Sequence, residues 1–321
     1  MPNNSLLSTL AVVATISILY ARHKYFSRPI STDQRSLLGI LGGLGPLASA
    51  WLTIKIVEAG QRDGARFDDE HARFIMYQQP TLPNSRNAAL GEGPSPHTGM
   101  VDAFHALKRA GATEVCVCCN TAHRFARAAA AEAGVPFLDM IDITCEAAIR
   151  CVTKAMVSTT EAAAQSAVVF VGLLGTDATL RLGLYQESLT RAALQLAGDA
   201  VRLRVLTPAD DGIGLLQQCI IDIKAGVLDH AGIGVRIESE AGKLVATAQK
   251  ALPAHGSASG GDVQSPLPMC IITGCTELPV CFSTETHPYF AVPIVSPLTT
   301  LAQAVVARGR VGAPSQPGAC D

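Results

Sequence analysis

The sequence predicts an α/β fold of two similar, pseudo-symmetric domains, each built on a mostly parallel sheet covered by helices. Two observations support this prediction. Short apolar runs alternate with segments of helical spacing, a pattern typical of parallel strands joined by covering helices. The pattern also restarts half-way, since the run at 37–45 (LLGILGGLG) resembles the run at 168–176 (VVFVGLLGT). This similarity indicates a duplication, with a cleft between the carboxyl ends of the two sets of strands.

Composition limits the possible classes of protein. The 321 residues are 48% hydrophobic, which suits one large or two modest globular domains. Charged residues make up 16%, and a net charge of -2 gives no electrostatic reason to bind nucleic acid. Several of the 10 cysteines, including Cys116, Cys118 and Cys270, lie inside apolar runs, as small core residues do. We therefore expect reduced thiols and a cytoplasmic globular part.

The N-terminus differs from the rest of the chain. Residues 5–20 are apolar and uncharged, and Arg22, His23 and Lys24 follow directly. The stretch is shorter than the roughly 20 residues that span a bilayer comfortably, and it lacks the basic start of a secretory signal. As a membrane anchor it would leave the following domains in the cytosol. The alternative is an extension that takes no part in the fold.

Each element of the first half follows from its local pattern. A buried apolar run that ends in a glycine-rich turn predicts the first strand within 37–46, and helical spacing predicts a helix at 47–59. Polar residues and four prolines predict one long loop over 78–96. The remaining patterns predict strands at 74–77, 115–118 and 135–140, and helices at 99–110, 124–133 and 143–151.

The second half repeats this order. Its apolar runs predict strands at 167–176, 201–206, 269–273 and 291–296, and its amphipathic stretches predict helices at 178–196, 214–225, 235–252 and 298–308. The low-complexity stretch at 253–268 predicts a surface insertion. We therefore place an extension and linker at 1–36, the first domain at 37–142 with 292–308 packing back on it, the second domain at 143–291, and a tail at 309–321.

The glycine-rich turn at 42–46 is suited to contact an anion through its backbone N–H groups. It is not a dinucleotide-binding fingerprint, because Pro46 and Leu47 occupy the later positions, and no Gly-Lys-Ser/Thr of a P-loop follows. We expect Gly45 to lie near a substrate carboxylate. The alternative is a tight turn that needs glycine only for a positive φ.

Two cysteines occupy matching places in the two halves. Cys119 and Cys275 each follow a buried strand and precede a helix start, where the pKa of a thiol is lowered. Either one alone could be a small residue in a crowded turn, but the pair predicts an active site with an acid on one side and a base on the other. No spaced Cys and His set completes a zinc site.

The motifs around these cysteines resemble a known family. GGLGP at 42–46, CNTAH at 119–123 and GCTELP at 274–279 are similar to motifs of the PLP-independent aspartate/glutamate racemases, and of their aspartate racemase branch in particular. The resemblance extends over residues 37–307. Its supporting segments are PTLPNSR at 80–86, LLGTDAT at 173–179, IKAG at 223–226 and VPIVSP at 292–297.

The resemblance implies an isomerase that inverts an acidic amino acid without a cofactor. Cys119 and Cys275 would lie on opposite faces of the substrate Cα, one removing the α-proton as thiolate and the other returning a proton as thiol. The implied reaction is the interconversion of L- and D-aspartate, with glutamate as the other candidate, in a protein that often forms dimers in this family. The implied substrate contacts are Gly45, Arg86, Asn120, Thr121, Ala122, Thr176, Lys224 and Thr276.

One departure leaves the substrate open. Relatives often carry arginine directly after Pro-Asn or Pro-Asp, whereas this chain has Ser85 there and Arg86 one residue later. Arg86 could still bind a side-chain carboxylate with two parallel hydrogen bonds. His123 could orient Cys119 or satisfy a local hydrogen bond. The alternatives to the racemase are a related cysteine-dependent isomerase acting on another substrate and a non-catalytic amino-acid-binding domain.

Overall fold

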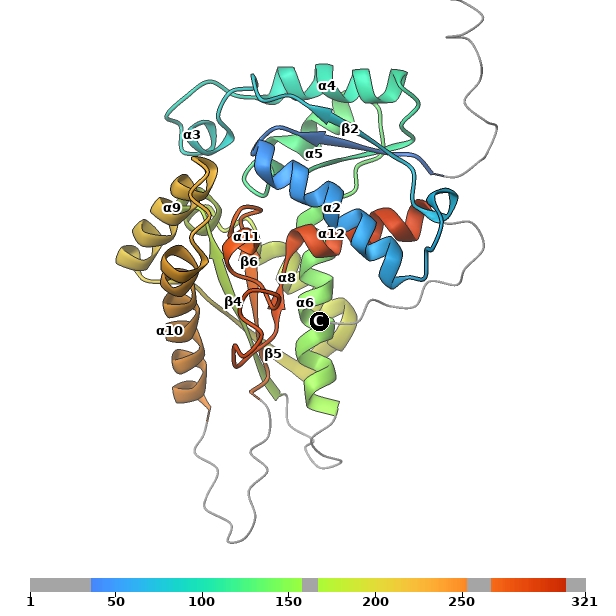
Figure 1. Cartoon of the computed structure of the whole chain (residues 1–321). Coiled ribbons are helices and arrows are strands. Elements are labelled where there is room, and N and C mark those ends of the chain that lie inside the picture. The colour runs from blue at the N-terminus through green and yellow to red at the C-terminus, as the bar shows by residue number, and fades with distance from the viewer. Residues whose placement is uncertain (1–35, 158–166, 253–266, 310–321) are drawn as a thin grey trace, which may run out of the picture. The chain divides into compact units, whose positions relative to one another are not determined.

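Two parallel sheets form the framework of the chain. The computed structural model describes residues 36–157, 167–252 and 267–309 (Figure 1). Over these ranges the strands form one sheet of three and one of four, and every strand pair is parallel. The predicted α/β class is confirmed. The apolar stretch at 5–20, the predicted insertion and the predicted tail fall wholly or mostly outside these ranges, and no helix within the ranges is long and apolar enough to cross a membrane.

The first sheet has the order β2–β1–β3. Its strands are β1 (Leu38–Gly42), β2 (Phe74–Gln78) and β3 (Glu114–Val117). Its helices are α2 (Pro46–Arg62), α3 (Ser85–Ala89), α4 (His97–Arg109), α5 (His123–Glu132) and α12 (Pro297–Gly309), with a 3₁₀ turn at Asp68–Glu70.

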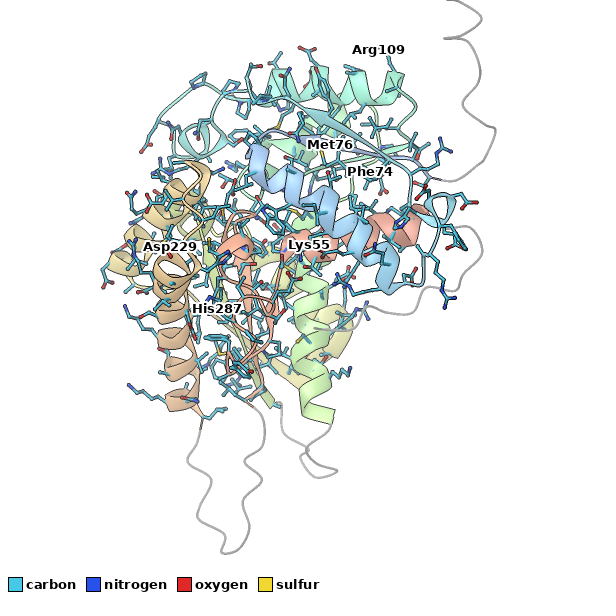
Figure 2. All side chains as sticks on the ribbon, viewed as in Figure 1. Lys55, Phe74, Met76, Arg109, Asp229 and His287 are labelled. Carbon is cyan, nitrogen blue, oxygen red and sulfur yellow. The ribbon has the colours of Figure 1, made fainter. Side chains whose placement is uncertain are left out.

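Alternation along β1 explains how these helices cover both faces. Successive strand residues point to opposite sides of a sheet. Leu38 and Ile40 therefore pack with α2 and α12, whereas Leu41 packs with α4 and α5. Phe74 and Met76 of β2 lie against the first of these clusters (Figure 2).

The second sheet has the order β5–β4–β6–β7. Its strands are β4 (Ala167–Gly175), β5 (Val201–Leu206), β6 (Met269–Gly274) and β7 (Ile294–Val295). The remaining helices are α6 (Met140–Val157), α7 (Asp177–Arg181), α8 (Gln186–Ala197), α9 (Asp210–Lys224), α10 (Val235–Ala251) and α11 (Leu278–Cys281), with short turns at Gly198–Ala200 and His230–Gly234. Phe170 and Leu174 face α9 and α10, and Val169 and Val171 face α6 and α8.

The C-terminal segment serves both sheets. Strand β7 pairs with β6 and extends the second sheet, with Ile294 opposite Ile271. Helix α12 then packs against α2, and its Leu301 and Val305 join the core of the first sheet.

Three sequence predictions about elements were wrong. The expected strand at 135–140 makes a single bridge, Val115 to Phe137, because Pro136 has no N–H to extend the ladder and the Asp139 side chain caps the next helix. The expected loop at 78–96 contains α3, which the Asn84 side chain caps. The expected helix at 178–196 breaks into α7 and α8 at Gly183, whose φ is 62°.

Candidate active site

Matching loops of the two sheets carry the predicted site. Strands β1 and β3 are neighbours in the first sheet, and β4 and β6 are neighbours in the second. Parallel neighbours end at the same edge of a sheet. The turn at 43–45 therefore lies beside the Cys119 loop, and Thr176 lies beside Cys275, since Gly175 and Gly274 are register partners.

Cys119 lies between the end of β3 and the start of α5. It is a free thiol and partly exposed. The backbone N–H groups of Thr121 and Ala122 donate hydrogen bonds to its sulfur. Two such donors favour a negatively charged sulfur. Burial outweighs them, so the pKa of Cys119 is raised, and the lowered pKa predicted from the helix start was wrong.

His123 holds the backbone of this loop. The N–H of Met140 donates to Nε2 at 3.2 Å, which assigns the ring proton to Nδ1, and Nδ1 donates to the Cys119 carbonyl oxygen at 2.7 Å. Its hydrogen bonds thus reach the Cys119 main chain and the start of α6. The ring positions the loop through local hydrogen bonds.

Cys275 has different neighbours. It follows β6 directly, is 5% exposed and is also a free thiol. Its Sγ–H donates to Oε2 of Glu277 at 3.1 Å, while the Glu277 N–H donates to the sulfur. A carboxylate that accepts the thiol proton favours the neutral thiol.

Glu277 is the central charged group of the site. It is 1% exposed, and its Oε1 accepts a hydrogen bond from Lys224 Nζ at 2.5 Å. Thr276 Oγ1 donates to Oε2 at 3.3 Å. A buried carboxylate needs such partners, because leaving it unpaired is costly.

Gly45 is required by this ion pair. A Cβ at position 45 would lie 1.8 Å from Glu277 Oε1 and 3.0 Å from Lys224 Nζ. Glycine therefore lets the first-half turn approach the carboxylate of the second half. Gly45, Lys224, Cys275 and Thr276, all predicted from sequence, gather around one residue that was not predicted as part of the site.

Burial and charge set the protonation of the two thiols. Burial raises the pKa of Cys119, and Lys224 and the two backbone donors oppose the rise, while Glu277 adds to it. Burial and then Glu277 raise the pKa of Cys275 well above its usual range, with Lys224 opposing. For Lys224, burial lowers the pKa, but Glu277 and both thiols outweigh it and raise the pKa overall. Both cysteines therefore share one cation and one anion.

Buried polar contacts join the halves near the cysteines. The hydroxyls of Thr121, Thr176 and Thr179 lie 2.9–3.2 Å from one another. Tyr185 donates to Oδ1 of Asn120 at 2.5 Å. Asn120 is 2% exposed, and its Nδ2 has no hydrogen-bond partner among the described residues.

Arg86 is engaged elsewhere in this structure. Its Nε donates to Asp177 Oδ1 at 2.7 Å, and its Nη2 donates to Oδ2 at 2.5 Å. The bidentate geometry predicted for a substrate carboxylate is thus made with a carboxylate of the other half. The substrate contact of Arg86 stays a prediction.

Three residues of the site were missed from sequence. Glu277 stands inside the GCTELP motif, and an acidic residue two places after a buried cysteine was a signal that could have been followed. Tyr185 and Asp177 gave no signal, because their contacts are with residues 65 and 91 positions away. Within the described ranges, no group of three or more His, Cys, Asp or Glu side chains could hold a metal ion.

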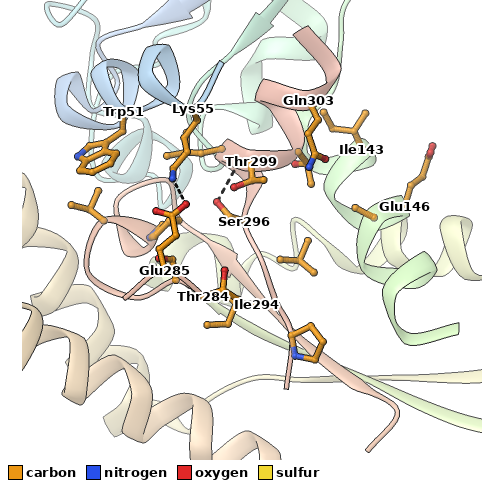
Figure 3. A pocket seen from close by; sticks show the side chains of 18 of the residues that line it. Trp51, Lys55, Ile143, Glu146, Thr284, Glu285, Ile294, Ser296, Thr299 and Gln303 are labelled. Carbon is orange, nitrogen blue, oxygen red and sulfur yellow. Dashed lines mark hydrogen bonds and ion pairs between the residues drawn. The ribbon is translucent and has the colours of Figure 1, made fainter. Parts of the chain in front are cut away.

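A cavity of about 200 Å³ lies outside this site, between α2, α6, α12 and the segment around Glu285 (Figure 3). Lys55 of α2 pairs with Glu285 at its wall. Neither cysteine lines it, although Pro279 and Val280 of α11 do. The cavity is therefore separate from the thiols.

The comparison with known families identifies the family of the chain. The profile of the Asp/Glu/hydantoin racemases matches residues 41–212, more than half of the chain. The chain belongs to the Asp/Glu/hydantoin racemase family. The resemblance predicted from the motifs is confirmed, and a racemase of the isomerase class is the activity that this family supports.

Individual members of the family are distant from this chain. The broad specificity amino-acid racemase RacX of Bacillus subtilis (strain 168) is 27% identical over 137 residues, which span 41% of this chain and 58% of RacX. The aspartate racemase of Picrophilus torridus has a TM-score of 0.56 at 20% identity, covering 85% of this chain and 93% of its own. An aspartate racemase homologue from Pyrococcus horikoshii has a TM-score of 0.55 at 20% identity, covering 85% and 98%. These structures show the shared racemase fold.

Proposed function

We propose that this chain interconverts the L and D forms of an acidic amino acid, aspartate or glutamate, by two-base proton transfer at Cα. One thiolate removes the α-proton, and the opposite thiol returns a proton from the other face. The observation that supports this proposal is the pairing of two free thiols, one from each half, around a single Lys224–Glu277 ion pair. The reaction as proposed uses no PLP, so groups of the site itself must stabilise the carbanion that forms when the α-proton is removed.

The site also offers donors for the charge that develops on the substrate. Removal of the α-proton places negative charge on the α-carboxylate, where preorganised donors act most strongly. The free amide N–H₂ of Asn120 is one such donor, and the ammonium of Lys224 is another. A buried donor without a partner costs about 1–3 kcal/mol. A substrate carboxylate that accepts from Asn120 removes this cost on binding.

A second candidate substrate is a neutral amino acid. The guanidinium of Arg86 is expected to bind a second substrate carboxylate, but in this structure it forms two hydrogen bonds with the carboxylate of Asp177. The B. subtilis relative is named a broad specificity racemase. If the Arg86–Asp177 pair persists with substrate bound, the site would accept an amino acid that lacks the side-chain carboxylate.

The test is isotope exchange with a panel of substrates. The protein is incubated in deuterium oxide with reductant and without PLP, separately with L-aspartate, L-glutamate and L-alanine. Loss of the α-proton signal is followed by NMR, and the enantiomers are resolved by chiral chromatography. We expect deuterated D-aspartate or D-glutamate. The rate of formation of the D-enantiomer should fall by about 10²–10⁴-fold in Cys119→Ala and in Cys275→Ala.

The outcomes separate the candidate functions. Exchange with alanine alone would replace the acidic substrate by a neutral one. Formation of the D-enantiomer that survives in either cysteine variant would exclude the two-thiol mechanism, whereas exchange without inversion in one variant agrees with it, because the remaining thiol can still remove and return the α-proton on its own face. Binding of an amino acid without any exchange, in folded protein, would leave a binding domain in place of an enzyme.

A further inference from the structure

The two thiols differ in the partners that their sulfurs have. The Cys119 sulfur accepts hydrogen bonds from two backbone N–H groups. The Cys275 sulfur accepts one such bond, from the Glu277 N–H, and gives its own proton to a carboxylate oxygen 3.1 Å away. The first arrangement stabilises a thiolate, and the second stabilises a thiol.

We propose that Glu277 is a positioning residue that holds the proton on Cys275, so that the two thiols ionise in a fixed order with Cys119 first. The ordering is a property of the free protein. Its catalytic meaning rests on the proposed function: Cys119 is the base of the more populated form, and Cys275 is the acid.

The charged and titratable groups around both sulfurs agree with this order. Cys275 faces Glu277 on its own loop, Lys224 from α9 and the Tyr185 hydroxyl from the turn before α8. Cys119 faces the same Lys224 and Glu277, and the buried thiol of Cys118 beside it. Lys224 favours both thiolates, so it does not decide between them. The direct hydrogen bond from Cys275 to Glu277 decides the order.

The proton count in one turnover follows directly. The Cys119 thiolate takes the α-proton and becomes a thiol, and the C–H electron pair stays on the substrate. The Cys275 S–H bond then breaks, its proton joins Cα from the opposite face, and Cys275 becomes a thiolate. That thiolate lies beside the Glu277 carboxylate with only Lys224 to balance them, so the form left after this turnover is the less stable one. Proton exchange with water, or turnover of the product enantiomer, restores the first form.

Glu277→Gln is the informative variant. Lys224 has only donors, so we expect the new amide to turn its oxygen toward Nζ and its N–H₂ toward the Cys275 sulfur. An acceptor of the thiol proton is thereby replaced by a donor to the thiolate. We expect the pKa of Cys275 to fall by about 1–3 units, and that of Cys119 by less.

The chain provides a matched control. Glu240 is 3% exposed and pairs with Lys243 at 2.6 Å, and a Cβ on Gly212 would lie 2.2 Å from its carboxylate. This pair repeats the Glu277–Lys224–Gly45 arrangement away from the two catalytic thiols. Glu240→Gln reports what loss of a buried carboxylate does to the protein in general.

The measurement is the pH dependence of alkylation by iodoacetamide, followed separately for the Cys119 and Cys275 peptides by mass spectrometry. The midpoint pH of each cysteine is compared with that of the same cysteine in the other variants, so the effect of its burial on alkylation is common to both values. In the unmodified chain we expect the Cys119 midpoint below that of Cys275. Glu277→Gln should lower the Cys275 midpoint by at least one unit, Glu240→Gln should leave it in place, and Glu277→Asp should retain much of the original midpoint.

Two results would overturn the proposal. One is a Cys275 midpoint at or below that of Cys119 in the unmodified chain. The other is a Cys275 midpoint that Glu277→Gln leaves unchanged. Because alkylation needs no turnover, a failure here is distinguishable from the absence of racemase activity, which the isotope exchange measures separately.

Discussion

The Cys119 and Cys275 loops occupy matching places in two similar halves, yet they differ in chemistry. Cys119 follows β3, an edge strand of the three-stranded sheet, and Cys275 follows β6, an inner strand of the four-stranded sheet, and each lies at the carboxyl end of its strand. Two backbone N–H groups favour the Cys119 thiolate, whereas the Cys275 loop provides one backbone N–H group and a carboxylate two residues later that accepts the thiol proton. Two similar backbones thus place two thiols in matching loops, and by the proposal above a single side chain, Glu277, makes Cys119 the better base and Cys275 the better acid.

Removal of the shared cation should have the largest effect on this comparison. Lys224→Met deletes the positive charge that favours both thiolates, so the pKa of each thiol should rise. A rise of about 1–3 units lowers the thiolate fraction at neutral pH by roughly 10–10³-fold. The acidic limb of the pH–rate profile should therefore shift to higher pH, which initial rates measured across pH would show.

The control for this variant is Lys243→Met. It also removes the partner of a buried glutamate, so both variants should lose some stability. Only Lys224→Met should move the pH–rate profile. Equal shifts in both variants would mean that the loss of stability, not the charge at the thiols, controls the rate.

Gly45→Ala tests whether the approach of the two halves matters. The added Cβ would meet Glu277 Oε1 at 1.8 Å, so the carboxylate must move away from Lys224 or the turn must shift. Displacements of this size at a reacting centre cost about 10²-fold in rate. Steady-state kcat/KM measures the effect.

Gly214→Ala is the matched substitution on α9. A Cβ there meets no atom within 4 Å, so activity should stay unchanged while the helix gains about 0.5–1 kcal/mol in thermal or denaturant unfolding. If Gly45→Ala also kept full activity, the Glu277–Lys224 pair would not need its present position.

Tyr185→Phe should have the smallest effect of the three. It keeps the buried ring and removes the hydroxyl that fixes the amide of Asn120. One neutral hydrogen bond is worth about 1 kcal/mol, so a fall of roughly 5- to 10-fold in kcat/KM is expected. Asn120→Asp provides the comparison, because it replaces the free N–H₂ by a carboxylate and should weaken binding of an anionic substrate more strongly. A Tyr185→Phe rate equal to that of the unmodified chain would show that Asn120 needs no such support.

The sequence predicted the fold class well because apolar periodicity is a local property. Strands β1, β3, β4 and β6, which position the site, all lie within one or two residues of their predicted bounds. The wrong predictions fall where one residue changes the local backbone. Pro136 limits a strand to one bridge, and Gly183 divides a helix.

By itself, the sequence determined the two thiols, their motifs and the family. It placed Cys119 and Cys275 at strand ends, and with the family resemblance it predicted Lys224 and Gly45 as substrate contacts. Only the tertiary structure decided which groups these residues meet. Glu277, which accepts the Cys275 thiol proton, pairs with Lys224 at a separation of 53 positions, and Arg86 pairs with Asp177 at a separation of 91. Electrostatic and hydrogen-bond energies depend on distance in space, so the different surroundings of the two thiols follow from how the chain folds.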